Sequence, residues 1–282
     1  MSASTNASTN TSTLTNIGIV VPTSFELEPY FEIWPQLETV SESPWQIYET
    51  SVGNGDAKIK VRLIVSYIGP ANAAAATEKL MTLPEPPQII LHGGAAGAIN
   101  STLMPGDIVL GRTVKTLCSQ EILAVRQSLL LSASAIRYIK DGRPVHIDNL
   151  PADINILQTA EKIATQVCDE LPPWSGPGWP ANVERRAARA ICGTLGSQDG
   201  WTKSTAELKY LATTFGVDSE DMESAYVAQI AAKHDIPCLA VRVVSNNEHT
   251  GTLAKDEILP AIGQAAKRAA LVICGIAQQL AT

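Results

Sequence analysis

The feature that most constrains this chain is the stretch 217–248, in which a helical pattern leads into an apolar strand with a polar end. Ala, Val and Ile recur at helical spacing over 224–234. Residues 238–244 are apolar except for Arg242, and Ser-Asn-Asn-Glu follows at 245–248. Open α/β sheets bind ligands just beyond the carboxyl ends of their strands. A carboxylate at the helix start and an amide at the strand end could therefore face one pocket. The alternative is a glutamate favoured by the helix dipole beside an ordinary polar loop.

Strand patterns alternate with helical patterns along the rest of the chain, which indicates one α/β domain. We expect strands over 17–21, 46–52, 58–65, 88–91, 106–114 and 190–195. We expect helices over 25–37, 71–83, 152–171, 204–214 and 258–280, with Pro260 in the first turn of the last one.

Other segments have weaker patterns. The glycine-rich segment 92–97 follows a buried strand, and we interpret it as a turn that lets the backbone approach a ligand. Its spacing matches neither the dinucleotide-binding motif nor the P-loop. Within the poorly patterned region 116–151, residues 135–139 and 144–147 predict a hairpin. The loop 172–180 carries two tryptophans, which we expect to pack against the protein body rather than to form a partner surface.

Composition narrows the class of protein. The 282 residues carry a net charge of −7, which argues against a nucleic-acid partner. Five cysteines are widely spread without a CxxC pair, which fits a reduced, cytoplasmic setting. The four histidines share no short motif, so we expect no metal site. Residues 1–16 are rich in Ser, Thr and Asn and are expected to be a disordered tail before a domain at 17–282. We expect no apolar run long enough to span a membrane.

A second carboxylate lies near another expected helix start. Residues 22–24 break the first strand, Ser24 is the expected N-cap, and Glu26 falls in the first turn, where the helix dipole favours negative charge. On these residues alone, Glu26 is either a helix-start residue or a functional carboxylate.

Five short motifs, in order along the chain, carry a resemblance to a known family. They are 17–20 with Glu26, Gly69 with 72–74, 94–97 followed by 106–109, 221–223, and 241–245. In these motifs the chain resembles the nucleoside phosphorylase and nucleosidase superfamily, nearest its methylthioadenosine/S-adenosylhomocysteine nucleosidase and futalosine hydrolase branch. The resemblance extends over nearly all of 17–280. It implies a single α/β domain with a mixed, barrel-like central sheet flanked by helices.

The resemblance also implies cleavage of the N-glycosidic bond of a nucleoside. Such a reaction needs groups that stabilise charge on the leaving base and on the ribose. Glu26 falls where nucleosidases of this branch keep the carboxylate that positions and deprotonates water. Phosphorylases need cationic groups for phosphate, and the hexameric type carries an arginine in its early glycine-rich loop. Here the segment 21–24 reads Val-Pro-Thr-Ser, so hydrolysis is favoured.

Other site residues follow from the same resemblance. Glu223 matches the glutamate that binds the ribose hydroxyls, and Met222 would pack beneath the sugar or base. Trp201 aligns with the aromatic residue that stacks on the base, and Thr202 with the neighbour whose backbone bonds it. Arg242 matches an arginine near the base end, although a salt bridge at the strand end is an equal alternative.

The chain departs from the family pattern at the base. Adenine-specific members have Ser-Asp where this chain has Ser245 and Asn246, and that Asp protonates N7 of the leaving base. The amide of Asn246 lacks an acidic proton, but it can donate to a 6-oxo oxygen and accept from N7–H. Ala95 replaces a serine of the adenine-type enzymes. Lys255 or a residue near it stands where those enzymes place an aromatic residue for the 5′-alkylthio group.

These observations favour a nucleosidase that hydrolyses a purine nucleoside, with a 6-oxopurine base preferred, to free base and ribose or 5′-modified ribose. The alternatives are a methylthioadenosine/S-adenosylhomocysteine nucleosidase in which water or Glu248 supplies the proton, a purine nucleoside phosphorylase, and a non-catalytic nucleoside-binding protein. We expect no cofactor and no membrane partner. Because the family completes its 5′ pocket with a neighbouring subunit, we expect a homodimer or higher homo-oligomer.

Overall fold

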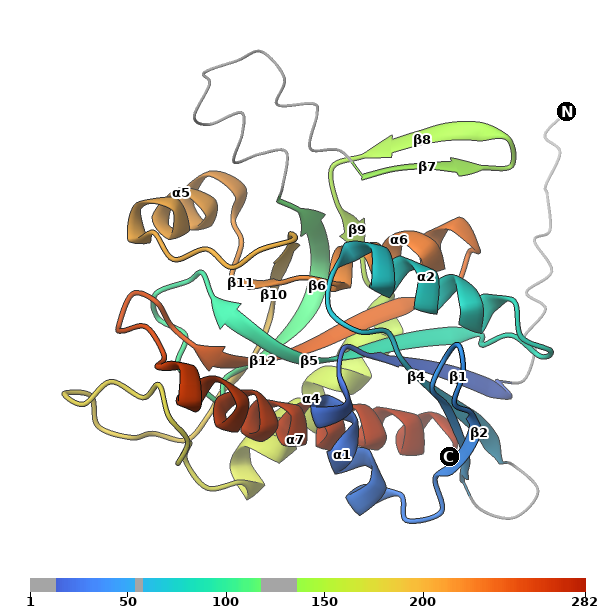
Figure 1. Ribbon diagram of the computed structural model, residues 1–282, viewed down its shortest axis with the longest axis horizontal. Helices are drawn as coiled ribbons and strands as arrows, with labels where there is room; N and C mark the ends of the chain where they lie inside the picture. Colours follow the sequence, from blue (N-terminus) through green and yellow to red (C-terminus); the bar gives the residue numbers. More distant parts are fainter. Residues whose placement is uncertain (1–13, 54–57, 118–135) are drawn as a thin grey trace, which may run out of the picture.

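The fold is organised around β5 (Ile89–Ala98), a long strand in the middle of a mixed sheet (Figure 1). The computed structural model describes residues 14–53, 58–117 and 136–282. Within these residues the sheet also contains β1 (Asn16–Val21), β2 (Glu38–Ser41), β3 (Ile47–Val52), β4 (Ile59–Val65), β6 (Ile108–Thr116), β9 (Leu150–Pro151), β10 (Ala190–Ser197), β11 (Ser219–Asp221) and β12 (Cys238–Asn246). A separate hairpin joins β7 (Ile136–Lys140) to β8 (Arg143–Ile147).

Part of the sheet closes into a barrel because the two halves of β5 have different neighbours. Its first half lies between β1 and β12 and runs parallel to both. Its last residues, Gly97 and Ala98, pair with the antiparallel strand β11. Since β11 pairs with β10, β10 with β6 and β6 with β12, five strands form a closed ring. The mixed, barrel-like sheet is confirmed.

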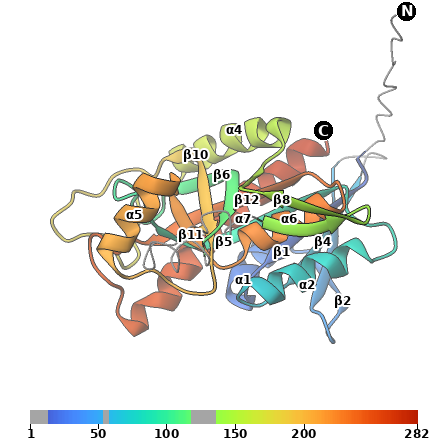
Figure 2. The same cartoon turned by 90° about the horizontal axis from the view of Figure 1, so that it is seen from above.

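Helices cover both faces of the sheet (Figures 1 and 2). The helices are α1 (Ser24–Ile33), α2 (Pro70–Met81), α4 (Ile154–Glu170), α5 (Thr205–Phe215), α6 (Ser224–Lys233) and α7 (Lys255–Leu280). Strand β1 shows the division, because successive side chains of a strand point to opposite faces. Ile17 and Ile19 join the core beneath α1, α4 and α7, whereas Val20 joins the core beneath α2 and α6.

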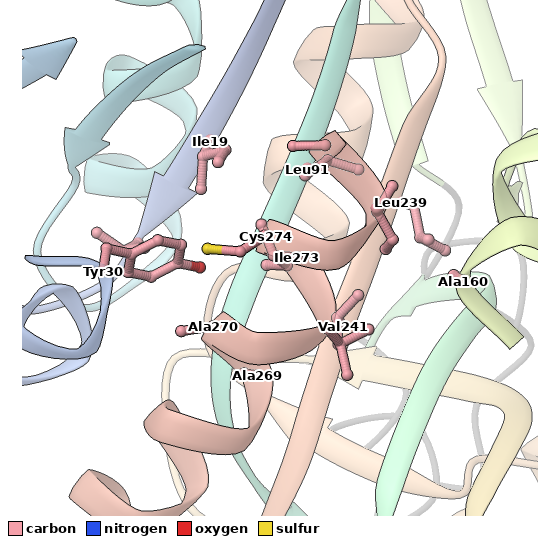
Figure 3. Packing of buried hydrophobic residues seen from close by; sticks show 14 of the residues in the cluster. Ile19, Tyr30, Leu91, Ala160, Leu239, Val241, Ala269, Ala270, Ile273 and Cys274 are labelled. Carbon is pink, nitrogen blue, oxygen red and sulfur yellow. The ribbon is translucent and has the colours of Figure 1, made fainter. Parts of the chain in front are cut away.

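Close packing explains the glycines of β5. Figure 3 shows α7 lying against the sheet, with Ile273 near Leu91 and with Tyr30 of α1 beside the same helix. A Cβ atom on Gly93 would lie 3.1 Å from the Tyr30 hydroxyl oxygen and would overlap Ile273. The prediction of a turn over 92–97 is therefore wrong. The segment continues β5, and its glycines allow neighbouring side chains to approach the strand.

Helix α7 corrects the expectation about membrane-spanning segments. Among the described residues, it is the one helix that is long and apolar enough to cross a membrane. Half of its most apolar window is buried inside the protein, where the helix packs against β5, β12, α1 and α4. We interpret α7 as a core helix, because a buried helix of a water-soluble domain meets the same length and composition criteria.

Two helices differ from the sequence prediction at their ends. Helix α1 ends at Ile33 with Trp34 as its C-cap, earlier than the expected residue 37. Helix α7 begins at Lys255, so Pro260 lies inside the helix and not in its first turn.

The hairpin within 135–147 is confirmed by β7 and β8. Trp174 is buried, and its indole donates to the Pro177 carbonyl oxygen at 2.9 Å, which confirms that this tryptophan packs against the body. Residues 1–13 of the expected tail, most of the turn between the second and third expected strands, and residues 118–135 lie outside the described residues.

Candidate active site

A cavity lies where β5, β11 and β12 end. The start of α1, the loops before α2 and α5, and the first turns of α7 complete its wall. Its lining residues are Pro22, Thr23, Glu26, Ile68, Ala95, Ala96, Gly97, Gly200, Trp201, Glu220, Asp221, Met222, Glu223, Arg242, Ser245, Asn246, Leu253, Ile258 and Ile262. Of the predicted site residues, all but Thr202 line this cavity.

Glu26 enters the cavity from the first turn of α1. Thr23 is the N-cap in place of the predicted Ser24, because Thr23 has an extended backbone and its hydroxyl accepts from the Glu26 N–H. The same hydroxyl donates to one Glu26 carboxylate oxygen at 2.8 Å, and the other oxygen accepts the Ala95 N–H at 3.0 Å. Burial raises the pKa of Glu26, and the Arg242 charge opposes this shift. A raised pKa makes the ionised carboxylate a stronger base.

Arg242 is a fully buried cation that connects the acidic side chains of the cavity. Its Nε lies 3.0 Å from an Asp221 carboxylate oxygen and donates to the Ser224 hydroxyl at 3.0 Å. Its Nη2 donates to Glu223 at 3.0 Å, and its Nη1 donates to the Ala95 carbonyl at 3.2 Å. The salt bridge that was one of the two interpretations of Arg242 is therefore present in the structure, and the side chain lines the cavity as well.

His92 and Gly94 complete the surroundings of Arg242. Burial, together with the Arg242 charge, lowers the pKa of His92 to about 3, so the ring is neutral. Its Nδ1 donates to the Val20 carbonyl at 2.8 Å, which leaves Nε2 to accept from Arg242. A Cβ atom on Gly94 would lie 2.6 Å from Arg242 Nη1 and would overlap the Glu26 carboxylate. Glycine at this position therefore allows Glu26 and Arg242 to meet over β5.

Glu223 precedes α6, but its side chain does not cap that helix. Asp221 accepts the N–H groups of Glu223 and Ser224, both at 2.9 Å, which leaves the Glu223 carboxylate free to point into the cavity. One Glu223 oxygen accepts the Gly69 N–H at 2.9 Å. Burial raises the pKa of Glu223 to about 7, against the opposing effect of Arg242. A role limited to the helix dipole does not explain this placement.

The amide of Asn246 is held in one orientation. Its oxygen accepts from the Ser245 hydroxyl at 2.9 Å, and its nitrogen donates to Glu248 at 3.2 Å. Glu248 also accepts from the Thr252 hydroxyl at 2.6 Å. One amide N–H and one oxygen lone pair of Asn246 remain for a ligand. Glu223 and Asn246 thus line one cavity, which is the first of the two interpretations that the strand and helix pattern left open.

The remaining predicted residues lie at the wall or behind it. Trp201, Met222 and Ala95 line the cavity. The Thr202 N–H, which the resemblance assigns to the base, donates to the Glu220 carboxylate at 2.9 Å. Glu220 is a buried acid that the sequence reasoning did not single out. A usable signal was the cluster of acids Glu220, Asp221 and Glu223 around Met222, just before the helix that begins at Ser224.

Within the described ranges, no group of three or more His, Cys, Asp or Glu side chains could hold a metal ion. Polar and charged groups of the cavity instead bond to one another and to backbone, as buried polar groups generally do.

A barrel-like α/β sheet with buried carboxylates, a cation and an aromatic residue at its strand ends defines a protein that binds a small polar ligand. The chain belongs to the phosphorylase superfamily, whose family model matches residues 16–278.

Relatives of this chain include proteins named as nucleosidases. The chain is 24% identical over 246 residues to the 5′-methylthioadenosine/S-adenosylhomocysteine nucleosidase of Glaesserella parasuis, covering 86% of this chain and 91% of that protein. It is 26% identical over 259 residues to the Listeria innocua enzyme of the same name, covering 91% and 96%. Among solved structures, futalosine hydrolase of Helicobacter pylori, as a mutant, has a TM-score of 0.70 at 17% identity, covering 94% of this chain and all of that one. The Neisseria meningitidis nucleosidase in complex with methylthio-immucillin-A has a TM-score of 0.70 at 20% identity, with the same coverage.

Proposed function

We propose that this protein is a nucleosidase that hydrolyses the N-glycosidic bond of a purine nucleoside, releasing free base and ribose or 5′-modified ribose. The observation that carries the proposal is the meeting of Glu26 and Glu223, from distant parts of the chain, around Arg242 in the cavity that also holds Trp201 and Asn246. The curated relatives with nucleosidase names support it.

Glu26 and Glu223 have different roles at the sugar. Glu223 accepts hydrogen bonds from the 2′- and 3′-hydroxyls, which stabilises the positive charge that develops on the ribose. Glu26 positions a water molecule at C1′ and takes its proton, since its raised pKa makes it a better base. A non-catalytic nucleoside-binding protein would have no use for such a base.

The charge of the cavity favours water over phosphate as the nucleophile. Arg242 is the one basic side chain among the described residues that line the cavity, and it is already engaged by Asp221 and Glu223. A phosphate dianion placed beside Glu26 would meet another negative charge without a free cation to offset it. These features disfavour a phosphorylase.

Asn246 supports a 6-oxopurine base. Its free N–H can donate to a carbonyl oxygen at C6, and its free lone pair can accept from N7–H. Adenine would need the amide to turn over, which would break the bonds to Ser245 and Glu248 that hold it. An unpaired buried polar group costs about 1–3 kcal/mol, which corresponds to a preference of roughly ten- to a hundredfold.

A methylthioadenosine/S-adenosylhomocysteine nucleosidase is the second candidate, and one specific observation favours it. Leu253, Ile258 and Ile262 give the cavity an apolar wall, although the aromatic residue of the adenine-type enzymes is missing near Lys255. Such a wall suits an apolar 5′ substituent such as an alkylthio group. The names of the curated relatives point the same way.

A nucleoside panel tests the proposal. Inosine, guanosine, adenosine, 5′-methylthioadenosine and 5′-methylthioinosine are incubated with the protein in phosphate-free buffer, and the free base is measured by chromatography. We expect base release, with each 6-oxo nucleoside exceeding its adenine counterpart. Faster release from 5′-methylthioadenosine than from 5′-methylthioinosine would favour the second candidate. No release from any nucleoside would refute hydrolysis altogether.

A further inference from the structure

Glu220 is a carboxylic acid in the cavity wall that has no role in the reaction as proposed above. It lies on β11 with an exposed fraction of 5%, and β11 pairs with β5 at Gly97. One carboxylate oxygen accepts the Thr202 N–H at 2.9 Å, and the other accepts from the Gln198 amide at 3.1 Å. Two neutral donors thus fix the side chain against β10 and the loop that follows it.

The charge around Glu220 differs from that around the other acids of the cavity. Glu223 and Asp221 form ion pairs with Arg242, and the Arg242 charge also acts on Glu26. Glu220 has only neutral donors, and the neighbouring Asp221 adds a like charge. Burial, with a smaller contribution from Asp221, raises the pKa of Glu220 to about 7. Near neutral pH this carboxyl group therefore holds a proton for much of the time.

The position of Glu220 relates it to Asn246 and the base. A Cβ atom on Gly97 would lie 3.6 Å from both the Asn246 amide nitrogen and Glu220 Cγ, so these two side chains flank Gly97. Ala95, whose backbone holds Glu26 and Arg242, lies two residues earlier on β5. Two residues of a strand span about 7 Å. Glu26 and Glu223, the carboxylates proposed to act on the sugar, are therefore displaced along β5 from Glu220 and Asn246.

We propose that Glu220 is the general acid that protonates the leaving purine base. This inference rests on the proposed function and deepens it, since the amide of Asn246 orients the base but has no acidic proton to give. The bond from C1′ to N9 breaks, and its electron pair goes to the base. The Glu220 carboxyl proton moves to a ring nitrogen of the base, leaving a carboxylate. Water adds to C1′ and gives a proton to Glu26, and both acids then re-equilibrate with solvent.

The proposal predicts a pH dependence with a definite sign. The protonated form of Glu220 is the active one, so kcat/KM falls as the pH rises above about 7. The pKa of Glu223 is also raised to about 7, and because its ionised form accepts the ribose hydroxyls, kcat/KM rises towards pH 7 from below, giving a bell-shaped profile. The groups that face Glu220 are Asp221 on β11, the neutral Thr202 and Gln198, and Asn246 on β12 with Glu248 behind it. Among these, Asp221 is ionised in its ion pair with Arg242, because Arg242 and other contacts outweigh burial and lower its pKa.

The experiment compares wild type and Glu220→Gln on two substrates at pH 6. One is the best nucleoside of the panel. The other is its N7-methylated derivative, whose base already carries a positive charge and leaves without a proton. We expect kcat/KM for the unmodified nucleoside to fall by about 10²–10⁴-fold. The methylated derivative should lose less than about tenfold, because its departure needs no acid. Glu78→Gln is the matched control, since Glu78 is not among the cavity-lining residues and pairs with Lys233 and His234.

Equal losses on the two substrates, or no loss on either, would overturn the inference while leaving hydrolysis intact. Absence of base release by wild type would instead refute the proposed function, and this inference with it. If Glu220→Gln fails to fold, or if the methyl group excludes the derivative, the pH profile of wild type with the unmodified nucleoside decides. A kcat/KM that does not fall between pH 7 and about 9 would then overturn a general acid with a pKa near 7.

Discussion

Replacing Glu223 by glutamine removes a carboxyl group that is negatively charged above its pKa of about 7, with little change of shape. In the wild type, one Glu223 oxygen accepts from the Gly69 N–H and the other accepts from Arg242. A glutamine has one oxygen and one NH₂ group, so one of these buried donors must face another donor. In the proposed reaction, the ribose hydroxyls also lose an acceptor at the stage when positive charge develops on the sugar. We expect kcat to fall by about 10²–10³-fold, or about 2.7–4 kcal/mol.

Steady-state release of free base from the best nucleoside measures this effect. We expect the loss mainly in kcat, because the contact strengthens in the transition state. The orphaned donor should also cost about 1–3 kcal/mol of folding stability, which a thermal melt would detect, but the variant should stay folded at assay temperature. Glu78→Gln controls for removal of an ion-paired glutamate outside the cavity. A Glu223→Gln enzyme within a few-fold of wild type would show that Glu223 only marks the start of α6.

The remaining predictions concern the base and the assembly. Asn246→Asp should shift the preference towards adenine nucleosides. The new carboxyl would lie beside Glu248, and when two carboxylates share a site the pKa of one is raised enough for it to supply a proton. An unchanged ratio of kcat/KM for adenosine-type over inosine-type substrates would contradict the assigned role of Asn246. We also expect a homodimer or higher oligomer with a contribution from the region 116–151, and light scattering at micromolar concentration that finds a monomer would refute this.

Most of the fold could be predicted from the sequence because its strands are strongly apolar and its helices are periodic. The strand β12 and the helices α2, α4, α5 and α6 appear within a few residues of their expected ends. The main error was the turn over 92–97. Glycines usually weaken strands, so a sequence rich in glycine predicts a turn. Only the folded structure shows that the side chains of Ile273, Arg242 and Glu26 pack against β5 where a Cβ atom would otherwise lie.

From sequence position, Glu26 and Glu223 could be placed at helix starts and Asn246 at a strand end, which left a functional and a structural interpretation open. The family resemblance, and not position, assigned these residues to one site. Glu220 could not be assigned in the same way. Its role depends on barrel closure between β11 and β5, which turns the side chain towards Gly97. That pairing joins segments more than a hundred residues apart and leaves no local pattern.

The hydrogen bonds among the site residues could not be predicted from the sequence either. The neutral His92 that accepts from Arg242 lies in a segment interpreted as a turn. The capture of the Thr202 N–H by Glu220 replaces a backbone contact that the family resemblance assigns to the base. Such pairings depend on side-chain distances of about 3 Å, which only the folded arrangement supplies.

The most direct test of the account is the identity of the sugar product. The best nucleoside is incubated with the protein in phosphate buffer and in phosphate-free buffer, and free sugar and sugar 1-phosphate are quantified. Because Glu26 is proposed to activate water, and because the described cavity residues include no cation free to bind phosphate, we predict free ribose or 5′-modified ribose in both buffers at the same rate. Ribose 1-phosphate, or its 5′-modified counterpart, as the main product in phosphate buffer would contradict it.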